Sequence, residues 1–327
     1  MDIKGKKFLI TGGVSLIGSH LVAALLRDGA DEIVLFDNFS LGSAELANTL
    51  TQRDRVSVIR GDVLRLVDVM DAMSTCDGVF ALAGYLTLPL AANPALGVEV
   101  NVMGVLNTLE AARLLKDKKV MFASSISVYG DQRFATIREE TPFGSFDLPP
   151  AFATYASTKL VGEHLGRLYA SKYGAHVCSA RFSTVYGENQ HIRGVNALYI
   201  LEAMLAVSRG EPPVISGSGH ESHDFIHASD VAKGCIAVMR SGKAGDAFNI
   251  ASGISTSVSD IVRMVLAEYG SDLKPKYSAD VRVARAPSHP KLDISIKRAQ
   301  EQLGWQPKVT IADGIRRLRE WLESKAK

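Results

Sequence analysis

A tyrosine and a lysine stand four residues apart in the segment YASTK, as Tyr155 and Lys159. The segment 153–173 around them has a helical pattern, and this spacing places both side chains on one face of a helix. An ammonium group stabilises a neighbouring phenolate, so Lys159 is expected to bring the pKa of Tyr155 towards neutrality, where it can exchange protons. The pair alone has little weight, because Tyr169 and Tyr173 also have helical spacing and are typical packing residues.

A serine-rich segment stands ahead of this helix in the chain. SSISVYG, at 124–130, follows an apolar run of strand length, so its hydroxyls are expected at the ligand-binding edge of a sheet. From there Ser125 would hold a substrate oxygen while Tyr155 exchanges the proton of that oxygen. For Ser124 and Ser127, a polar turn that caps the strand is an equally good interpretation.

A glycine-rich turn lies between the first apolar run and a helical pattern. The turn is TGGVSLIG, at 11–18, and the amides at the start of the helix would face a pyrophosphate with the positive end of the helix dipole. Gly12 allows the turn, and Gly18 allows the helix to pack on the strand. Ser15 stands where the commoner motif has a third glycine, and its side chain is expected to keep a pyrophosphate slightly farther from the backbone. Taken alone, such a turn is also compatible with an ordinary strand-to-helix connection.

A carboxylate ends the second apolar run. Asp37 lies about twenty residues beyond the glycine turn, where a carboxylate can accept both hydroxyls of an adenosine ribose. A turn residue before Asn38 is the alternative, but the two features together favour a dinucleotide site. The next arginine is Arg53, so a 2′-phosphate would meet a carboxylate and no nearby cation. We therefore expect NAD rather than NADP as cofactor.

These residues need a scaffold that brings the ends of several strands together. The first half of the chain alternates apolar runs of strand length with helical patterns, and several runs are apolar on both faces. The runs lie at 8–11, 33–37, 56–59, 79–83 and 120–124, and helical patterns at 16–28 and 94–116. This alternation predicts an α/β protein with a Rossmann-type, doubly wound parallel sheet that binds ligands at the carboxyl ends of its strands.

The second half is expected to add a smaller region. After the helix at 153–173 and a strand at 176–181, strict alternation fades and glycine, proline and polar clusters become common. A final helix at 311–325 carries Ile315, Leu318 and Leu322 at helical spacing. We assign 1–182 to an NAD-binding Rossmann domain, with 224–254 returning to it, and 183–223 and 255–327 to a smaller C-terminal α/β substrate-binding region.

The composition is that of a globular protein. Of 327 residues, 46% are hydrophobic and 22% charged, and 37 basic residues are interspersed with 35 acidic ones, which disfavours nucleic acid as a partner. Cys76, Cys178 and Cys235 lie far apart, so neither a disulfide framework nor a metal site is indicated. The short apolar start does not resemble an export signal, and two prolines interrupt the uncharged stretch 78–98, so no membrane span is expected. We expect a cytoplasmic protein.

In their order along the chain, these motifs resemble the extended short-chain dehydrogenase/reductase family. They are most similar to its NAD-dependent epimerase/dehydratase branch, which acts largely on nucleotide sugars. The similarity covers most of the chain. It is carried by TGGVSLIGSHLV from Thr11, Asp37 with Asn38, GDV from Gly61, ALAG from Ala81, NVMGVLNTLEAAR from Asn101, SSISVYG, YASTK, RFSTVYG from Arg181, HDFIHASDVA from His223 and LGWQP from Leu303.

The resemblance implies roles for individual residues. Ser125, Tyr155 and Lys159 would be catalytic, and no metal would take part. Contacts with NAD are implied for Gly12, Ser15, Leu16, Ile17, Gly18, Asp37, Asn38, Phe39, Ser40, Asp62, Val63, Leu82, Ala83, Gly84, Asn101, Ser124, Tyr155, Lys159 and Phe182, with Asp62 and Val63 at the adenine and Asn101 supporting the active-site helix. Contacts with substrate are implied for Ser127, Thr184, His223 and Arg285. The helices at 94–116 and 153–173 would pair with those of a second subunit, which implies a homodimer.

Two departures from the family pattern bear on the substrate. The branch often has asparagine at the position of Thr184 and arginine at that of His223, and both typically contact the nucleotide diphosphate. Histidine is only partly charged at neutral pH, so this exchange weakens the case for a conventional nucleotide sugar. A surface-loop residue is an equally good interpretation of His223. The candidate replacement cations are Arg181, Arg193, Arg282 and Arg285.

A third departure bears on the reaction. Ile126 and Ser127 stand where sugar 4,6-dehydratases of the family carry an Asp-Glu pair, so no acid and base for removing water are evident. The leading hypothesis is a nucleotide-sugar epimerase that transiently oxidises a sugar hydroxyl at C4 to a ketone. One alternative is a dehydrogenase or reductase with net redox, acting on a sugar or another hydroxyl substrate. The other is a dinucleotide-binding sensor, although a sensor has no need of Ser125, Tyr155 and Lys159.

Overall fold

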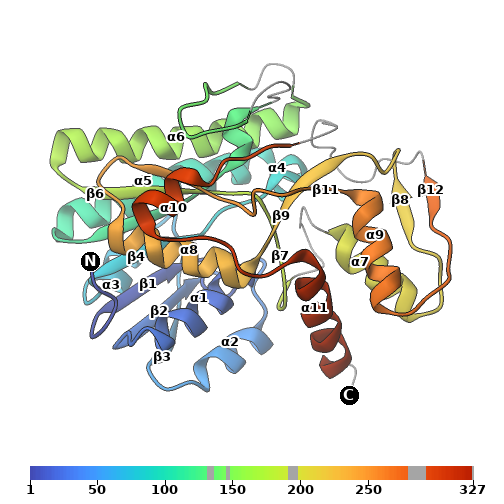
Figure 1. Cartoon of the computed structure of the whole chain (residues 1–327). Coiled ribbons are helices and arrows are strands. Elements are labelled where there is room, and N and C mark those ends of the chain that lie inside the picture. Colours follow the sequence, from blue (N-terminus) through green and yellow to red (C-terminus); the bar gives the residue numbers. More distant parts are fainter. Residues whose placement is uncertain (131–135, 145–147, 191–197, 279–291, 326–327) are drawn as a thin grey trace.

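The computed structural model describes residues 1–130, 136–144, 148–190, 198–278 and 292–325. Its larger unit is built on a seven-stranded parallel sheet with the order β10-β6-β5-β4-β1-β2-β3 (Figure 1). The strands are β1 Lys7–Thr11, β2 Glu32–Asp37, β3 Val56–Arg60, β4 Gly78–Ala81, β5 Lys119–Ser125, β6 His176–Phe182 and β10 Ala247–Ile250. The predicted Rossmann-type sheet is confirmed.

The order of the strands reverses at β1. The chain runs from β1 to β2 and β3 on one side, and then returns to β4, β5 and β6 on the other. Thr11 at the end of β1 pairs with Phe36 in β2 and with Ala81 in β4. The connections that leave β1 and β4 therefore diverge, and they leave a crevice at the carboxyl ends of these strands.

Helices cover both faces of this sheet (Figure 1). One layer contains α1 (Leu16–Arg27), α2 (Ala44–Thr51) and α8 (Ala228–Ser241), and the other contains α3 (Leu66–Met73), α5 (Pro94–Leu115) and α6 (Pro150–Tyr173). Successive residues of β1 point to opposite layers, so Phe8 and Ile10 join one hydrophobic core while Leu9 joins the other. This double burial explains why the strand sequences are apolar on both faces.

The two long helices begin and end where the sequence places helix signals. Asn93 caps α5, with its side chain accepting from the amide of Leu96, and Pro94 follows in the first turn. Pro150 begins α6, and Gly174 ends it in the left-handed conformation, with φ +69°. The uncharged stretch 78–98 is divided among β4, the short helix α4 (Thr87–Ala92) and the start of α5. Among the described residues, no helix is long and apolar enough to span a membrane.

A smaller unit follows β6. Its elements are β7 (Thr184–Tyr186), β9 (Ser222–His227) and β11 (Ser255–Ser257) in one sheet, β8 (Val214–Ser216) and β12 (Lys276–Ser278) in another, and the helices α7 (Leu198–Ser208), α9 (Val258–Glu268) and α11 (Ile311–Lys325). Met204, Ile261, Val262, Ile315 and Leu318 are buried together in its own core. Figure 1 shows this unit beside the carboxyl ends of the large sheet.

Two later segments return to the large unit. α8 packs against α1, and β10 pairs with β6 at the edge of the sheet. The helix α10 (Lys297–Leu303) also packs there, because Ala299 and Trp305 belong to the core shared with α1 and α8. The Trp305 indole donates to the carbonyl of Asp230 in α8 at 3.2 Å. The structure thus differs from the expected division, which placed all of 255–327 with the smaller unit.

Candidate active site

One cavity of about 390 Å³ lies at the carboxyl ends of the strands and extends to β7 and β9 of the smaller unit. It contains most of the residues that the sequence suggested. These are Gly12, Ser15, Leu16, Ile17, Asp37, Asn38, Ser40, Val63, Leu82, Ala83, Gly84, Ser124, Ser125, Ser127, Tyr155, Lys159, Phe182, Thr184 and His223. The dinucleotide and substrate candidates therefore face a single space.

The glycine-rich turn packs closely under this cavity. Gly12 has φ +65°, and a Cβ there would lie 2.9 Å from Cα of Ala83. Gly18 does not line the cavity, and a Cβ on it would lie 2.2 Å from the carbonyl oxygen of Gly13. Ser15 caps α1, since its hydroxyl donates to the Gly12 carbonyl at 2.7 Å and accepts from the Gly18 amide at 3.2 Å. The Ser15 hydroxyl is thus bonded within its own loop, at the lining of the cavity.

Asp37 is bonded to two backbone amides. Its Oδ2 accepts from the amide of Val14 at 3.0 Å, and its Oδ1 accepts from that of Phe39 at 2.8 Å. Phe39 has a positive φ of 62° and packs against the hydrophobic core, away from the cavity lining. Asp37 therefore holds the glycine turn and the end of β2 together at the cavity wall.

Two other residues that were expected to contact NAD, Asp62 and Asn101, lie outside the cavity lining. Asp62 accepts from the Leu64 amide at 3.0 Å, which shapes the loop after β3. Asn101 is buried in α5, where its Oδ1 accepts from the Tyr85 amide at 2.7 Å and its Nδ2 donates to the Thr158 hydroxyl at 3.1 Å. Asn101 thereby joins the loop after β4 to α6, the helix of Tyr155 and Lys159.

The serine segment turns directly into a short 3-10 helix, η1 (Ile126–Tyr129). The Ser125 hydroxyl oxygen accepts from the Ser127 hydroxyl at 2.9 Å and from the Ser127 amide at 3.1 Å. The Ser125 hydroxyl also lowers the pKa of Tyr155, so it favours the phenolate form of that residue. Because Ser127 fills the acceptor sites of the Ser125 oxygen, Ser125 keeps its own proton for donation to another oxygen. Sequence reasoning missed this orienting role of Ser127, since spacing within a loop does not reveal it.

Tyr155 and Lys159 are both buried beneath the cavity. Burial raises the pKa of Tyr155 to about 12, although the hydrogen bond from Ser125 lowers it. Burial lowers the pKa of Lys159 to about 8, and its ammonium donates to the Ala123 carbonyl at 3.0 Å. The Lys159 nitrogen lies 5.8 Å from the centroid of the Tyr155 ring. In this arrangement burial outweighs the expected effect of Lys159, so the pKa of Tyr155 lies above its ordinary value and not towards neutrality.

Thr184 and His223 lie on neighbouring strands at the far end of the cavity. Thr184 begins β7, and His223 lies in β9 within 3.2 Å of the Tyr199 hydroxyl. Burial lowers the pKa of His223 to about 4, so the ring is neutral at physiological pH. The interpretation of His223 as a surface-loop residue is wrong, because its ring packs between Tyr199 and Phe225 in the cavity wall.

Comparison with known proteins identifies the family. A family model described as GDP-mannose 4,6 dehydratase matches residues 9–318. The chain belongs to this family, within the extended short-chain dehydrogenases/reductases. A putative UDP-glucose 4-epimerase of Methanocaldococcus jannaschii is 29% identical, over 97% of this chain and 98% of its own.

Solved structures of epimerases share the whole fold. The UDP-N-acetylglucosamine 4-epimerase of Methanobrevibacter ruminantium, in complex with UDP-N-acetylmuramic acid, superposes with a TM-score of 0.87 at 27% identity, over 98% of this chain and 99% of the other. The UDP-glucose 4-epimerase of Thermus thermophilus, in complex with NAD, superposes with a TM-score of 0.83 at 26% identity, over 97% and 99% of the two chains. Members of this extended family thus place a nucleotide sugar or NAD on the fold described here.

Arg181 was one of the cations expected to replace the phosphate-binding arginine that the family often has at the position of His223. That prediction is wrong. Arg181 is fully buried and pairs with Glu163, away from the cavity lining. Arg193, Arg282 and Arg285 lie outside the described residues. Among the described residues that line the cavity, Lys159 is the only lysine or arginine, and Asp37 is the only carboxylate.

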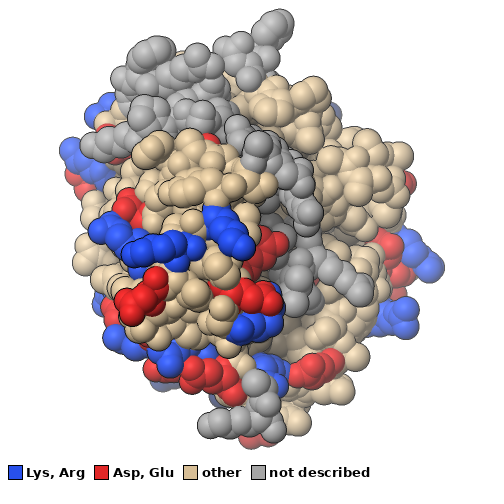
Figure 2. Space-filling model, turned by 90° about the vertical axis from the view of Figure 1, so that its right-hand side faces the viewer, with Lys and Arg blue, Asp and Glu red and all other residues tan. Residues whose placement is uncertain are grey.

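Charges of both signs are interspersed on the molecular face that Figure 2 shows, with uncharged surface between them. Ion pairs within one helix also bring the two signs together, such as Arg319 and Glu323 of α11, whose side chains lie 2.8 Å apart. Among the described residues of the face in Figure 2, neither the positive nor the negative side chains form a continuous stripe.

Proposed function

We propose that this chain is an NAD-dependent epimerase of nucleotide sugars, which transiently oxidises a sugar hydroxyl at C4 to a ketone. One observation carries the proposal: a single cavity joins the glycine turn and Asp37 to the catalytic candidates Ser125, Tyr155 and Lys159. The M. jannaschii, M. ruminantium and T. thermophilus relatives, all named as 4-epimerases, support the reaction class.

The residues at the end of the cavity formed by the glycine turn and Asp37 fit NAD. Gly12 leaves room at a position where a Cβ would collide with Ala83, and the start of α1 directs backbone amides to the space above it. Asp37 lines the cavity where the adenosine ribose would lie, and it would accept from the ribose hydroxyls. When bound, NAD supplies the acceptor for the hydride.

The chain's own residues handle the proton. Ser125 would hold the oxygen of the reacting hydroxyl, and the Tyr155 oxygen would accept the hydroxyl proton and later return it. The Ser125 hydrogen bond stabilises the phenolate form of Tyr155 against the effect of burial on its pKa. Lys159, one helical turn from Tyr155, would bond the nicotinamide ribose and add positive charge beneath the reacting atoms.

The lining disfavours elimination of water, despite the name of the family model. Ile126 lies in the cavity wall at one of the two positions where sugar 4,6-dehydratases of the family carry a carboxylate. Among the described residues of the lining, Asp37 is the only carboxylate, and it lies at the end of the cavity where we place the cofactor. Epimerisation needs no further acid or base beyond the Ser125 and Tyr155 pair.

The fate of the hydride tests the reaction class. An epimerase returns the hydride to the molecule from which it came, so a substrate deuterated at the reacting carbon is expected to give a product that keeps its deuterium. Mass spectrometry of a panel of UDP-, GDP-, CDP- and dTDP-sugars measures this, while absorbance monitors reduced nicotinamide. Stoichiometric release of NADH with any sugar would replace the epimerase with a dehydrogenase.

Exchange of Asp37 tests the cofactor. Asp37→Ala is expected to weaken NAD binding by about 10- to 100-fold, because a charged hydrogen-bond acceptor is lost. The preference for NAD over NADP is expected to narrow, since the carboxylate no longer repels a 2′-phosphate. Titration of both cofactors by fluorescence measures this, and Asp37→Asn, which keeps the shape, isolates the effect of charge. A wild-type protein that prefers NADP would contradict the assignment.

We also propose a homodimer formed by α5 and α6. These helices pack side by side, and both carry exposed apolar side chains. Met103 and Leu114 share a face of α5, and Val161 and Leu168 share a face of α6, with exposures of 40–51%. Light scattering at micromolar concentration is expected to give a dimer, and Leu168→Glu is expected to give a monomer. A monomeric wild type would refute this assembly.

The compartment that we propose is the cytoplasm. Cys76, Cys178 and Cys235 are all unpaired and buried, which suits a reducing environment. Nucleotide sugars are the partners that the proposed epimerase requires. Binding of a labelled nucleotide sugar to the purified protein would test this choice of partner directly.

A further inference from the structure

We propose that the buried ion pair of Glu163 and Arg181 is a positioning element, which fixes the serine segment (residues 124–129) against the helix of Tyr155. The inference rests on the proposed function only in treating Ser125 and Tyr155 as the reacting pair. Neither Glu163 nor Arg181 lines the cavity, so any effect on the reaction passes through the residues that they hold.

Glu163 connects the first end of the serine segment to α6. It lies four residues after Lys159 and eight after Tyr155, on the same side of the helix. Its Oε1 accepts from the Ser124 hydroxyl at 2.6 Å and from Arg181 Nε at 2.8 Å, while its Oε2 accepts from Arg181 Nη2 at 2.7 Å. Ser124 directly precedes Ser125, so Glu163 holds the catalytic serine to the catalytic helix through one intervening residue.

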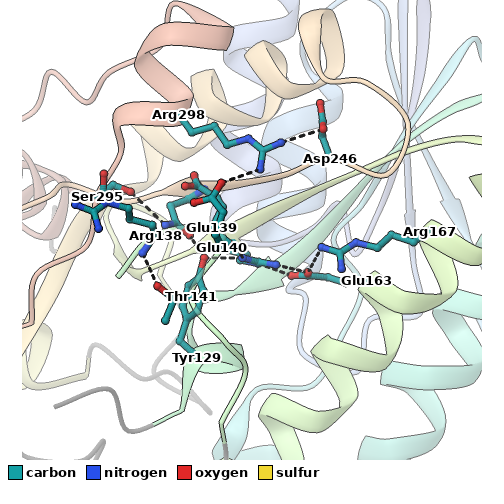
Figure 3. Close-up of polar contacts among 12 residues, drawn as sticks. Tyr129, Arg138, Glu139, Glu140, Thr141, Glu163, Arg167, Asp246, Ser295 and Arg298 are labelled. Carbon is teal, nitrogen blue, oxygen red and sulfur yellow. Dashed lines mark hydrogen bonds and ion pairs between the residues drawn. The ribbon is translucent and has the colours of Figure 1, made fainter. Parts of the chain in front are cut away.

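Arg181 connects the other end of the same segment. Its Nη1 donates to the Tyr129 hydroxyl at 2.6 Å, and that hydroxyl donates to Asn249 Oδ1 in β10 at 2.7 Å. The Arg181 guanidinium also lies 4.9 Å from the centre of the Tyr129 ring. Figure 3 shows the Tyr129 hydroxyl beside this network and Glu163 pointing into it from α6. The ion pair thus bonds both ends of the segment that carries Ser125 and Ser127.

The directional bonds explain why charged residues occupy this position. A buried ion pair is weak evidence for stability, because desolvation of two charges offsets their attraction, and an apolar pair of equal volume is often as stable. The arginine fork, however, fixes its partners in one plane and at set angles, which apolar packing does not do. The reaction needs that precision, because a misplacement of about 1 Å can lower a rate by about 10²-fold.

Two substitutions test the positioning role, with one matched control. Tyr129→Phe keeps the ring and the ion pair but removes the hydroxyl that ties the segment to Arg181. Glu163→Gln removes the charge of the central carboxylate. Tyr169→Phe is the control, because Tyr169 lies on the same helix and its hydroxyl also donates a hydrogen bond, to Glu110 at 2.8 Å, without touching the serine segment.

The first readout is kinetic. In Tyr129→Phe we expect kcat to fall by about tenfold or more while KM stays within about twofold, because binding is kept and alignment is lost. Glu163→Gln is expected to lower kcat further, and Tyr169→Phe to leave it unchanged. An unchanged kcat in Tyr129→Phe would overturn the proposal, and this variant decides the question if Glu163→Gln does not fold.

The second readout needs no substrate. In protein labelled with fluorotyrosine, Tyr155→Phe identifies the Tyr155 resonance, and the fluorine chemical shift of that resonance at neutral pH reports the surroundings of the phenol, with NAD and without it. Loss of alignment changes the contact with Ser125, so the Tyr155 chemical shift is expected to change in Tyr129→Phe and not in Tyr169→Phe. An unchanged chemical shift in Tyr129→Phe would overturn the proposal, and this measurement stays decisive even if no nucleotide sugar reacts.

Discussion

Replacement of Tyr155 with phenylalanine is expected to lower kcat by about 10²-fold or more while NAD still binds. The ring is 6% exposed and would keep its packing in the variant. The hydroxyl, whose pKa Ser125 lowers and which we propose exchanges the substrate proton, would be lost. Turnover of the sugar identified in the isotope experiment and titration of NAD measure the two effects separately.

A second tyrosine on the same helix provides the control. Tyr173 lies at the end of α6 and is 46% exposed, so Tyr173→Phe is expected to match the wild type in both measurements. Retained activity in Tyr155→Phe would move the proton transfer to another group. Loss of NAD binding would instead show that the phenol shapes the cavity, and it would contradict the division of roles between Tyr155 and the cofactor residues.

The fold could be read from the sequence because its signals are local. The helical pattern at 16–28 corresponds to α1, Leu16–Arg27, and the run at 33–37 lies within β2, Glu32–Asp37. Gly12 in the turn after β1 and Pro94 at the start of α5 determine the backbone conformation of their immediate neighbours, which is why a sequence pattern detects them. The expected division of the second half was less accurate, because the return of α10 to α8 depends on Trp305, which contacts residues distant in the sequence.

The site could be predicted only as far as residue types along the chain determine it. The sequence places Arg181 at the end of a strand, but its burial depends on Glu163 from another element. In the same way, the neutral state of His223 follows from its packing beside Tyr199. Charge state and hydrogen-bond direction are set by tertiary neighbours, and these are the features that sequence reasoning missed.

Lys159→Met is expected to abolish most activity and at the same time to stabilise the protein without NAD. Burial lowers the pKa of Lys159 from 10.5 to about 8, so at pH 7 the folded protein holds a charge that burial disfavours. At roughly 1.4 kcal/mol for each pKa unit, this costs about 3 kcal/mol of folding free energy. Methionine avoids that cost, whereas loss of the bond to the Ala123 carbonyl offsets about 1 kcal/mol. The net gain is expected to be about 2 kcal/mol.

The pH dependence of this gain identifies its cause. Between the folded pKa of about 8 and the unfolded value of 10.5, the unfolded wild type binds more protons than the folded one, so its stability rises with pH. The advantage of Lys159→Met is therefore expected to be complete below pH 8, to shrink as pH rises through this window and to reverse above it, where only the loss of the bond to Ala123, about 1 kcal/mol, remains. Urea denaturation of both proteins across the window measures it. A variant that is less stable than the wild type at pH 7, or a difference that does not change with pH, would show that Lys159 is buried as a neutral or well-compensated group. The expected loss of turnover in Lys159→Met is about 10²-fold. A variant that gains stability while it loses this activity would show that the charge at Lys159 is retained for chemistry and not for folding.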